Sequence, residues 1–397
     1  MMLSPEVDVR AITLVRGNTD IENVKRNAVT SLEVIYKQYM YFNLSIPSSL
    51  ELPVLAIGEG HPLNPDFSKG SDGFMGSDGL GDIFTLDLYK PSENWEAKLD
   101  YKSHWQENEK DDKLFFKSTP RQGPEEILYQ LKHAPPLTIT LLAVGPLTNL
   151  ATAYLLDPVT FLRAKRIVIM GGSIPSPGNT SPHGEFNFAN DPEAAHLVLG
   201  TSKGYNPKIH TYDHRLQLLK KGKRVPMELF IFPKFQADQE IDGITITKQD
   251  YFERIVPLKT PIGVISTSML ELSFIRDPQR HLERNNHQEL VSDDTIAGVI
   301  LLDIMNGVFE RHWQSDYLNL LVETRNREYL GACLYDYNNS SNTKNSSTGH
   351  DNIKEQEEDN TINQKYSNVR MILGGTKGLP HYSNIIMSRL FSSHYTD

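Results

Sequence analysis

The sequence predicts an α/β protein whose core is an open, mainly parallel sheet with helices on both faces. Two observations indicate this fold class. Short apolar runs, of which the β-branched run 166–170 is typical, alternate along the front half of the chain with longer stretches that suit helices. Glycine and proline punctuate the boundaries, as Gly171-Gly172 does after the run 166–170. A strand–helix–strand order of this kind brings successive strands together in parallel.

The elements are expected in a Rossmann-like order. Strands are predicted at residues 11–15, 54–57, 138–144 and 166–170, and helices at 22–41, 123–133 and 148–156. The helix 148–156 lies between Gly145-Pro146 and Asp157-Pro158, which fits the places where proline is tolerated near helix ends. No G-x-G-x-x-G turn opens a helix, which argues against a dinucleotide site. Residues 369–390 are expected to form a further strand and helix.

The chain is expected to form a single domain over residues 1–397, interrupted by polar stretches. Residues 92–120 are charged and aromatic and suggest a surface insertion, and residues 201–250, which lack clear periodicity, suggest a second one. Residues 338–365 are rich in Asn, Ser, Lys and Glu and have almost no apolar side chains. Such a stretch cannot bury enough surface to offset the entropy of ordering, so we expect it to be disordered.

The bulk composition argues against several classes of function. The 397 residues carry a net charge of −10, and no basic run exceeds residues 220–224, so no nucleic-acid surface is expected. No apolar run approaches about 18 residues, so no membrane span is expected. The single cysteine, Cys333, excludes a disulfide framework and suits a reducing compartment. Because no secretory leader pattern is found at the start of the sequence, a cytoplasmic location is expected.

A polar loop follows the apolar run 166–170 and carries the strongest functional signal. The loop is rich in Pro, Ser, Gly and Asn and ends in Glu185-Phe186-Asn187, a carboxylate and an amide on either side of an aromatic ring. In an open α/β sheet, ligands bind at the carboxyl ends of the strands. Together with Asn179, these side chains can bind several adjacent hydroxyls, as a sugar presents them. The sequence therefore predicts a sugar site at this end of the sheet.

This segment closely resembles the MGG…GN…EFN…DPEAA signature of the inosine-uridine-preferring nucleoside hydrolases. Further motifs of that family are matched in order, and the resemblance covers most of residues 8–337. The matches are AITLVRGN at 11–18, similar to ITTVAGN; Asn27-Ala28; VLAIGEGHPL at 54–63; DGLG at 78–81; TITLLAVGPLTNLATAYLLDP at 138–158; the D-x-x-A pattern at 294–297; and VET at 322–324 with Gly331, similar to a late hairpin.

The resemblance implies an N-glycosyl hydrolase that cleaves purine or pyrimidine ribonucleosides to free base and ribose. On the family pattern the ribose would be bound by Asn18, Asn179, Glu185 and Asn187, and the sugar and base would be lined by Met170 and Phe186. The partner implied is therefore a small molecule, a nucleoside or ribose. A homo-oligomer is also implied, since family members are usually dimers or tetramers.

Several of these residues also have a plain structural interpretation. Asn18 and Asn179 each follow a glycine and could be turn residues. Met170 could belong only to the core, and Phe186 could serve only packing.

The resemblance implies a calcium ion, but few of its ligands are matched. In the family an acidic D-x-D-x-G-x-D-D loop ends the first strand, holds calcium and supplies the aspartate that deprotonates the attacking water. No such cluster precedes Asn18, so this strand and loop are expected to be missing, and no catalytic residue is assigned. The remaining implied ligands are the Val144 carbonyl and Asp294, whereas calcium prefers roughly 6–8 oxygens. Asp293-Asp294 could instead be a pair favoured at a helix N-terminus.

Two functional hypotheses remain open, beside a third account in which the chain is a purely structural or misfolded fragment. The first is a nucleoside hydrolase whose first strand and acidic loop lie outside this sequence. The second is a catalytically inactive nucleoside- or ribose-binding remnant, which retains Glu185-Phe186-Asn187 without the aspartates. Asp293 and Met75 stand where members of the family have histidines, so protonation of the leaving base would differ from the family pattern.

Overall fold

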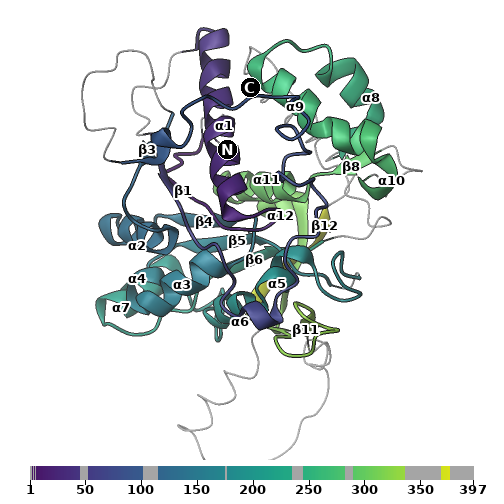
Figure 1. Cartoon of the computed structure of the whole chain (residues 1–397). Helices are drawn as coiled ribbons and strands as arrows, with labels where there is room; N and C mark the ends of the chain where they lie inside the picture. Colours follow the sequence, from purple (N-terminus) through teal and green to yellow (C-terminus); the bar gives the residue numbers. More distant parts are fainter. Residues whose placement is uncertain are drawn as a thin grey trace, which may run out of the picture.

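The computed structural model describes residues 2, 4, 6–44, 52–101, 115–174, 177–234, 245–281, 289–335 and 368–375. Its centre is a sheet of five strands in the order β4-β5-β6-β12-β9 (Figure 1). These strands are β4 (Thr140–Ala143), β5 (Arg166–Met170), β6 (Leu229–Phe232), β12 (Val369–Gly375) and β9 (Trp313–Leu318). All neighbours pair in parallel except β12 and β9. The α/β class with a mainly parallel, open sheet is therefore confirmed.

Both faces of this sheet are covered, because alternate residues of a strand point to opposite faces. On one face Ile167 and Ile169 pack in a core that also holds residues of α2, α3 and α6. On the other face Val168 and Met170 pack with residues of α11 and α12. The helices are α2 (Gly123–His133), α3 (Thr148–Leu156), α4 (Pro158–Phe161), α6 (Pro192–Gly200), α11 (Asp293–Met305) and α12 (Phe309–His312).

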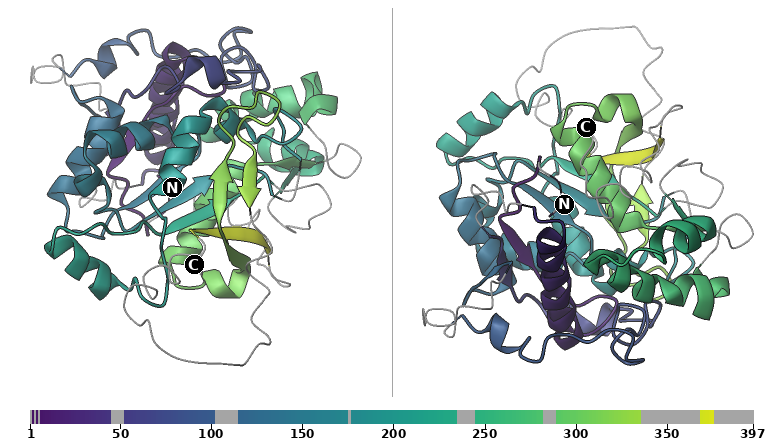
Figure 2. Two further views of the ribbon diagram at one scale, coloured as in Figure 1. Left: turned by 90° about the horizontal axis from the view of Figure 1, so that it is seen from below. Right: turned by 90° about the horizontal axis from the view of Figure 1, so that it is seen from above.

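A second, smaller parallel sheet is built from the N-terminal part of the chain. Its order is β1-β2-β3, with β1 (Ala11–Thr13), β2 (Val54–Ala56) and β3 (Lys117–Ser118). The long helix α1 (Ile21–Tyr41) packs beside this sheet (Figure 2). The Asp20 side chain begins α1 by accepting a hydrogen bond from the backbone N–H of Asn23 at 2.9 Å.

Further helices and hairpins complete the described structure. They are η1 (Pro65–Phe67), η2 (Ala97–Leu99), α5 (Phe186–Asn190), α7 (Tyr212–Lys220), β7 (Thr245–Thr247) paired with β8 (Glu289–Val291), α8 (Lys248–Asp250), the π-helical turns η4 (Tyr251–Ile255) and η5 (Leu272–Arg276), α9 (Pro261–Glu271), α10 (Pro278–His281), and the hairpin β10 (Leu320–Val322) with β11 (Cys333–Tyr335). No helix of this described part is both long and apolar enough to cross a membrane.

Most predicted elements of the front half are found, with boundaries shifted by a residue or two. The helices Gly123–His133 and Thr148–Leu156 have the predicted limits, and the expected late hairpin is formed by β10 and β11. The strand predicted from residue 369 is β12. The helix expected after it and the stretch 338–365 lie outside the described residues.

The interpretation of 201–250 as an insertion does not hold for all of that range. It contains β6, which pairs with β5 on one side and β12 on the other, and all four residues of β6 are buried. This part of the chain is therefore central core. The apolar run is only four residues long, and periodicity does not distinguish so short a buried strand from another buried segment.

Candidate functional site

The turn after β5 is held by a single carboxylate. Glu185 accepts hydrogen bonds from three backbone N–H groups, those of Gly172 (2.9 Å), Asn187 (2.8 Å) and Phe188 (3.1 Å). Glu185 thereby caps the N-terminus of α5 and ties that helix to the Gly171-Gly172 turn. We call Met170, Gly171, Gly172, Glu185 and Asn187 the β5-end cluster.

Both glycines of the cluster are required by their surroundings. A Cβ on Gly171 would lie 2.5 Å from the Phe188 ring, so only glycine allows this close approach. Gly172 has φ of +82°, and a Cβ there would lie 2.8 Å from the Cys333 sulfur. The backbone can therefore turn directly from β5 toward the Glu185 carboxylate.

The Glu185 side chain is only 1% exposed, and this burial has an electrostatic consequence. Loss of solvation raises the pKa of Glu185 to about 7. The three backbone hydrogen bonds oppose this increase, and the nearby Asp293 carboxylate adds to it. Glu185 can therefore exist in both protonation states near neutral pH. A carboxylate has about four acceptor positions, so three backbone donors leave capacity for one further donor.

Asn187 lies beside Glu185 and is also buried. Its Nδ2 donates to the Met170 carbonyl at 3.1 Å and lies 3.2 Å from the Met170 sulfur. Among the described residues nothing donates to its side-chain oxygen, which remains able to accept a hydrogen bond. Met170 itself packs in the core below the cluster, as its structural interpretation requires.

Asn179 and Phe186 lie at the outer edge of the cluster. The exposed Asn179 side chain accepts a hydrogen bond from the backbone N–H of Phe186 at 2.8 Å, and the Phe186 ring is half-buried. Asn179 therefore fixes the loop that leads into α5. The structure brings five of the eight predicted site residues, Met170, Asn179, Glu185, Phe186 and Asn187, into one connected group.

The predicted metal-ligating residues lie at neighbouring positions. Val144 directly follows β4, which pairs with β5, and Asp294 is in the first turn of α11, which packs on the same strand. Asp294 is solvent-accessible, yet the surrounding protein and the adjacent Asp293 raise its pKa to about 7.

These positions do not form a calcium site by themselves. Within the described ranges there is no group of three or more His, Cys, Asp or Glu side chains that could hold a metal. One carbonyl and one carboxylate fall short of the roughly 6–8 oxygens that calcium prefers. The described residues therefore do not fit the calcium ion that the sequence resemblance implies.

Asn18 is exposed on the loop after β1 and lies apart from the hydrogen bonds of the cluster. Its backbone carbonyl accepts a hydrogen bond from Ser71 Oγ at 2.6 Å, and the structure records no side-chain contact from Asn18 to the β5-end cluster. Arg16, two residues before Asn18, does reach toward α5. Arg16 Nη2 donates to Ser68 Oγ at 3.0 Å and to Asn190 Oδ1 at 3.1 Å.

Two buried polar residues that the sequence did not single out join the loops around the cluster. Asn149 Nδ2 donates to the Leu14 carbonyl at 2.8 Å, and its Oδ1 accepts from the Glu59 N–H at 2.8 Å. Asp191 accepts from Thr148 Oγ1 at 2.7 Å and from the Leu63 N–H at 2.9 Å. Both belong to motifs matched in the sequence, GPLTN and DPEAA, but their cross-linking role depends on contacts distant in sequence.

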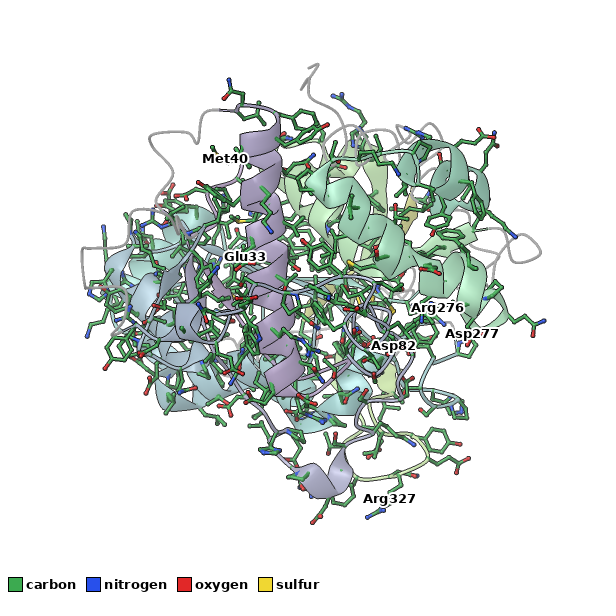
Figure 3. All side chains as sticks on the ribbon, turned by 45° about the horizontal axis from the view of Figure 1, so that its top comes forward. Glu33, Met40, Asp82, Arg276, Asp277 and Arg327 are labelled. Carbon is green, nitrogen blue, oxygen red and sulfur yellow. The ribbon has the colours of Figure 1, made fainter. Side chains whose placement is uncertain are left out.

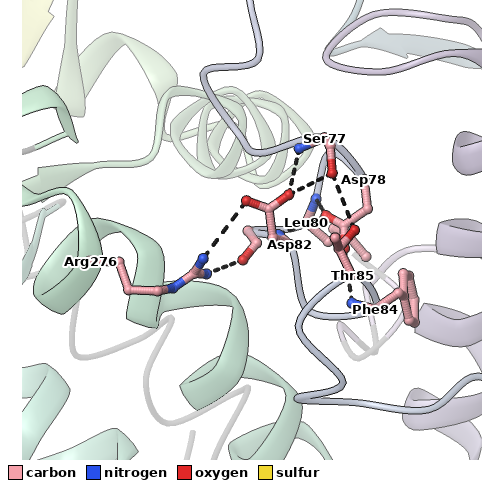
Figure 4. Close-up of polar contacts among 8 residues, drawn as sticks. Ser77, Asp78, Leu80, Asp82, Phe84, Thr85 and Arg276 are labelled. Atoms are coloured by element: carbon pink, nitrogen blue, oxygen red, sulfur yellow. Dashed lines mark hydrogen bonds and ion pairs between the residues drawn. The ribbon is translucent and has the colours of Figure 1, made fainter.

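The DGLG motif is an organised loop rather than an open site. Asp78 is buried and accepts from the backbone N–H groups of Leu80, Asp82 and Phe84 at 2.8, 2.8 and 3.0 Å (Figure 4). Arg276, at the end of η5, binds the Gly81 carbonyl and pairs with Asp82 at 3.7 Å. Figure 3 shows Arg276 and Asp82 side by side where the helical segment meets this loop.

Comparisons with known proteins agree with this architecture. The sequence profile described as inosine-uridine preferring nucleoside hydrolase matches residues 1–369. The chain is 31% identical over 196 residues to uridine nucleosidase 1 of Arabidopsis thaliana, covering 49% of this chain and 46% of that protein. It is 32% identical over 199 residues to the inosine-uridine preferring nucleoside hydrolase of Leishmania major, covering 50% and 51%. The chain thus spans about half the length of these curated relatives.

Solved structures extend the likeness to the fold. The structure titled plant nucleoside hydrolase superposes with a TM-score of 0.65 at 19% identity, covering 98% of this chain and 93% of that one. A purine-preferring ribonucleoside hydrolase from Gardnerella vaginalis superposes with a TM-score of 0.62 at 16% identity, covering 98% and 92%. At these identities the likeness concerns the fold alone. Because the profile matches most of the sequence, the chain belongs to the inosine-uridine preferring nucleoside hydrolase family.

Proposed function

We propose that this protein binds a ribonucleoside by its ribose at the carboxyl end of β5 and hydrolyses the N-glycosidic bond. The observation that carries the proposal is that the buried side chains of Glu185 and Asn187 lie next to each other at one turn. Each can still accept a hydrogen bond after its contacts with the protein are made. Vicinal sugar hydroxyls need such fixed acceptors, and the backbone network holds both residues in place before the ligand arrives.

In the reaction, the bond between the anomeric carbon and the base nitrogen breaks, and a bond from that carbon to a water oxygen forms. One proton of the water goes to the leaving base, directly or through a protein group. The transition state has the character of a ribosyl cation, so hydrogen bonds from sugar hydroxyls to Glu185 and Asn187 strengthen as positive charge develops. Asp294, solvent-accessible and with a raised pKa, is suited to exchange a proton with water near neutral pH.

Asn18, Asn179, Met170 and Phe186 have supporting roles in this proposal. Asn179 orders the loop in front of Phe186, and Met170 receives a hydrogen bond from Asn187 at its carbonyl. Phe186 would cover the sugar or base. Asn18 would complete the sugar contacts from the neighbouring loop. The substrates to test first are inosine and uridine, which occur in the names of related proteins.

The test is calorimetric titration of the chain with inosine and with uridine, paired with chromatography for released base. Asn187→Ala should weaken ribose binding by about 10-fold or more, because one or two hydrogen bonds of roughly 1–1.5 kcal/mol each are lost. Asn306→Ala, at the exposed far end of α11, is the matched control and should bind like the wild type. Absence of binding for inosine, uridine and ribose alike would contradict the proposal.

A second candidate function is binding of a nucleoside or ribose without hydrolysis. The residues around the proposed sugar site favour it, since the described residues include no cluster of carboxylates that could hold a metal there. The same experiment separates the two functions: heat of binding without released base, with calcium added and after chelation, supports the second. Release of free base, with or without added calcium, supports the first.

A further inference from the structure

We propose that Tyr329, in the turn between β10 and β11, is a positioning residue for the ribose site. Its ring stacks on His183 and thereby holds the loop that leads into Glu185 in the conformation that binds sugar hydroxyls. This inference rests on the proposed function and deepens it, because it concerns the same site. Tyr329 acts through the loop and not by contact with the ligand.

The β10–β11 hairpin lies directly against the segments that form the β5-end cluster, and Figure 1 shows β11 close to α5 and α6. Ala332 forms an antiparallel bridge with Gly184, the residue before Glu185. The Cys333 sulfur lies so close to Gly172 that a Cβ there would be 2.8 Å away, and the Gly172 N–H donates to the Glu185 carboxylate. The hairpin therefore contacts both the chain that enters Glu185 and the turn to which its carboxylate is bonded.

The loop 178–184 is folded on itself. The Gly184 carbonyl accepts hydrogen bonds from the backbone N–H groups of residues 179–181 at 3.2, 3.3 and 3.4 Å. A loop braced in this way is expected to move as one unit. A displacement of His183 is therefore passed on to Glu185, two residues farther along the chain.

The turn that carries Tyr329 is held by its own hydrogen bonds. The Glu323 N–H donates to the Ala332 carbonyl at 3.0 Å, and the Gly331 N–H donates to the Glu323 carbonyl at 3.0 Å. The Glu323 carboxylate accepts from two further backbone N–H groups of the turn at 2.8 and 3.0 Å. Tyr329 therefore projects from a fixed support toward the loop 178–184.

The contact between the two rings serves position rather than burial. The ring centroids are 4.6 Å apart and the ring planes are 11° from parallel, a stacked arrangement. Tyr329 is 36% exposed, and His183 is exposed as well. Neither ring belongs to a hydrophobic core cluster of the described residues. Removing the stack should therefore loosen the loop and leave the core intact, and the backbone bridge at Gly184 should keep the loss partial.

The experiment measures the affinities of wild-type protein and Tyr329→Ala for inosine, 2′-deoxyinosine and 3′-deoxyinosine by calorimetry. Wild-type protein should bind inosine about 10-fold or more tightly than the weaker deoxy ligand, which lacks the hydroxyl that Glu185 accepts. Tyr329→Ala should weaken inosine binding by about 3- to 10-fold, the range expected for one aromatic stack, and change the weaker deoxy ligand by less than about 2-fold. The preference for inosine should therefore fall. Tyr329→Phe keeps the ring and should restore both affinity and preference.

A second variant removes the other ring of the stack. His183→Ala should have the same effect as Tyr329→Ala. The double variant should bind inosine no more weakly than either single variant, because the same contact is lost in all three proteins. Urea unfolding of every variant is measured in parallel.

Tyr129→Ala is the matched control, because Tyr129 on α2 is 39% exposed and its ring also contacts a histidine, His133, with centroids 4.1 Å apart. It should leave affinity and preference unchanged. Wild-type affinity and preference in Tyr329→Ala would overturn this inference and leave the proposed function standing. The same holds if Tyr329→Ala weakens all three ligands by one factor, since general damage to the fold would have that effect. Failure of the wild-type protein to bind any of the three ligands would overturn both proposals.

Discussion

The buried Glu185 carboxyl should make the stability of this protein depend on pH in a way that one substitution removes. Its pKa is about 7 in the folded protein against an ordinary value of 4.5. The folded state therefore holds the proton more tightly than the unfolded chain between these values, and stability must fall as pH rises through this window. Each pKa unit corresponds to about 1.36 kcal/mol, so the contribution lost between pH 4.5 and 7 is roughly 3 kcal/mol.

Glu185→Gln cannot ionise, so the variant should lack this part of the pH dependence. It should also be less stable than the wild type at pH 4.5, because the amide nitrogen cannot accept one of the three backbone N–H groups, a loss of about 1–3 kcal/mol. The difference between the two proteins should shrink or reverse toward pH 7.

The measurement is urea unfolding of both proteins at several values between pH 4.5 and 7.5. Glu253→Gln serves as control, since its exposed carboxylate accepts a single hydrogen bond from Gln249 on the surface. A wild-type minus Glu185→Gln difference that stays constant across this range would refute the reasoning.

Two further substitutions test the backbone and the loop connections. Gly172→Ala should destabilise the fold by roughly 2–3 kcal/mol in urea unfolding, because φ of +82° disfavours alanine and its Cβ would meet the Cys333 sulfur. A change below about 0.5 kcal/mol would show that the turn can relax. Asn149→Ala should cost about 2–4 kcal/mol by leaving the Leu14 carbonyl and the Glu59 N–H without their partner, and a normal melting curve for this variant would contradict that role.

The elements that the sequence predicted well are those with local signals. The helix Thr148–Leu156 lies between prolines, and β5 is an apolar run that ends at two glycines. β6 was missed because its position between β5 and β12 depends on pairing partners far along the chain. A four-residue apolar run has no period that distinguishes a buried strand from other buried segments.

The candidate site was predictable in composition but not in its connections. The expected sugar residues Glu185, Asn187 and Met170 do lie together, since they follow one strand and its turn. Glu185 accepts hydrogen bonds from three backbone N–H groups because of the conformation of the loop, and the spacing of residues in the sequence does not specify that conformation. The bond from Arg16 to Asn190 links residues 174 positions apart, beyond any local pattern.

The division into two sheets has a consequence for how the molecule behaves in solution. Among the described strands, β4 and β1 each pair on one side only. Asn149 of α3, the helix that follows β4, donates to the carbonyl of Leu14, just after β1. The backbone N–H and C=O groups at the edge of a sheet can pair with another extended peptide. Either sheet can therefore be extended at this edge by one more strand, from this chain or from a second molecule.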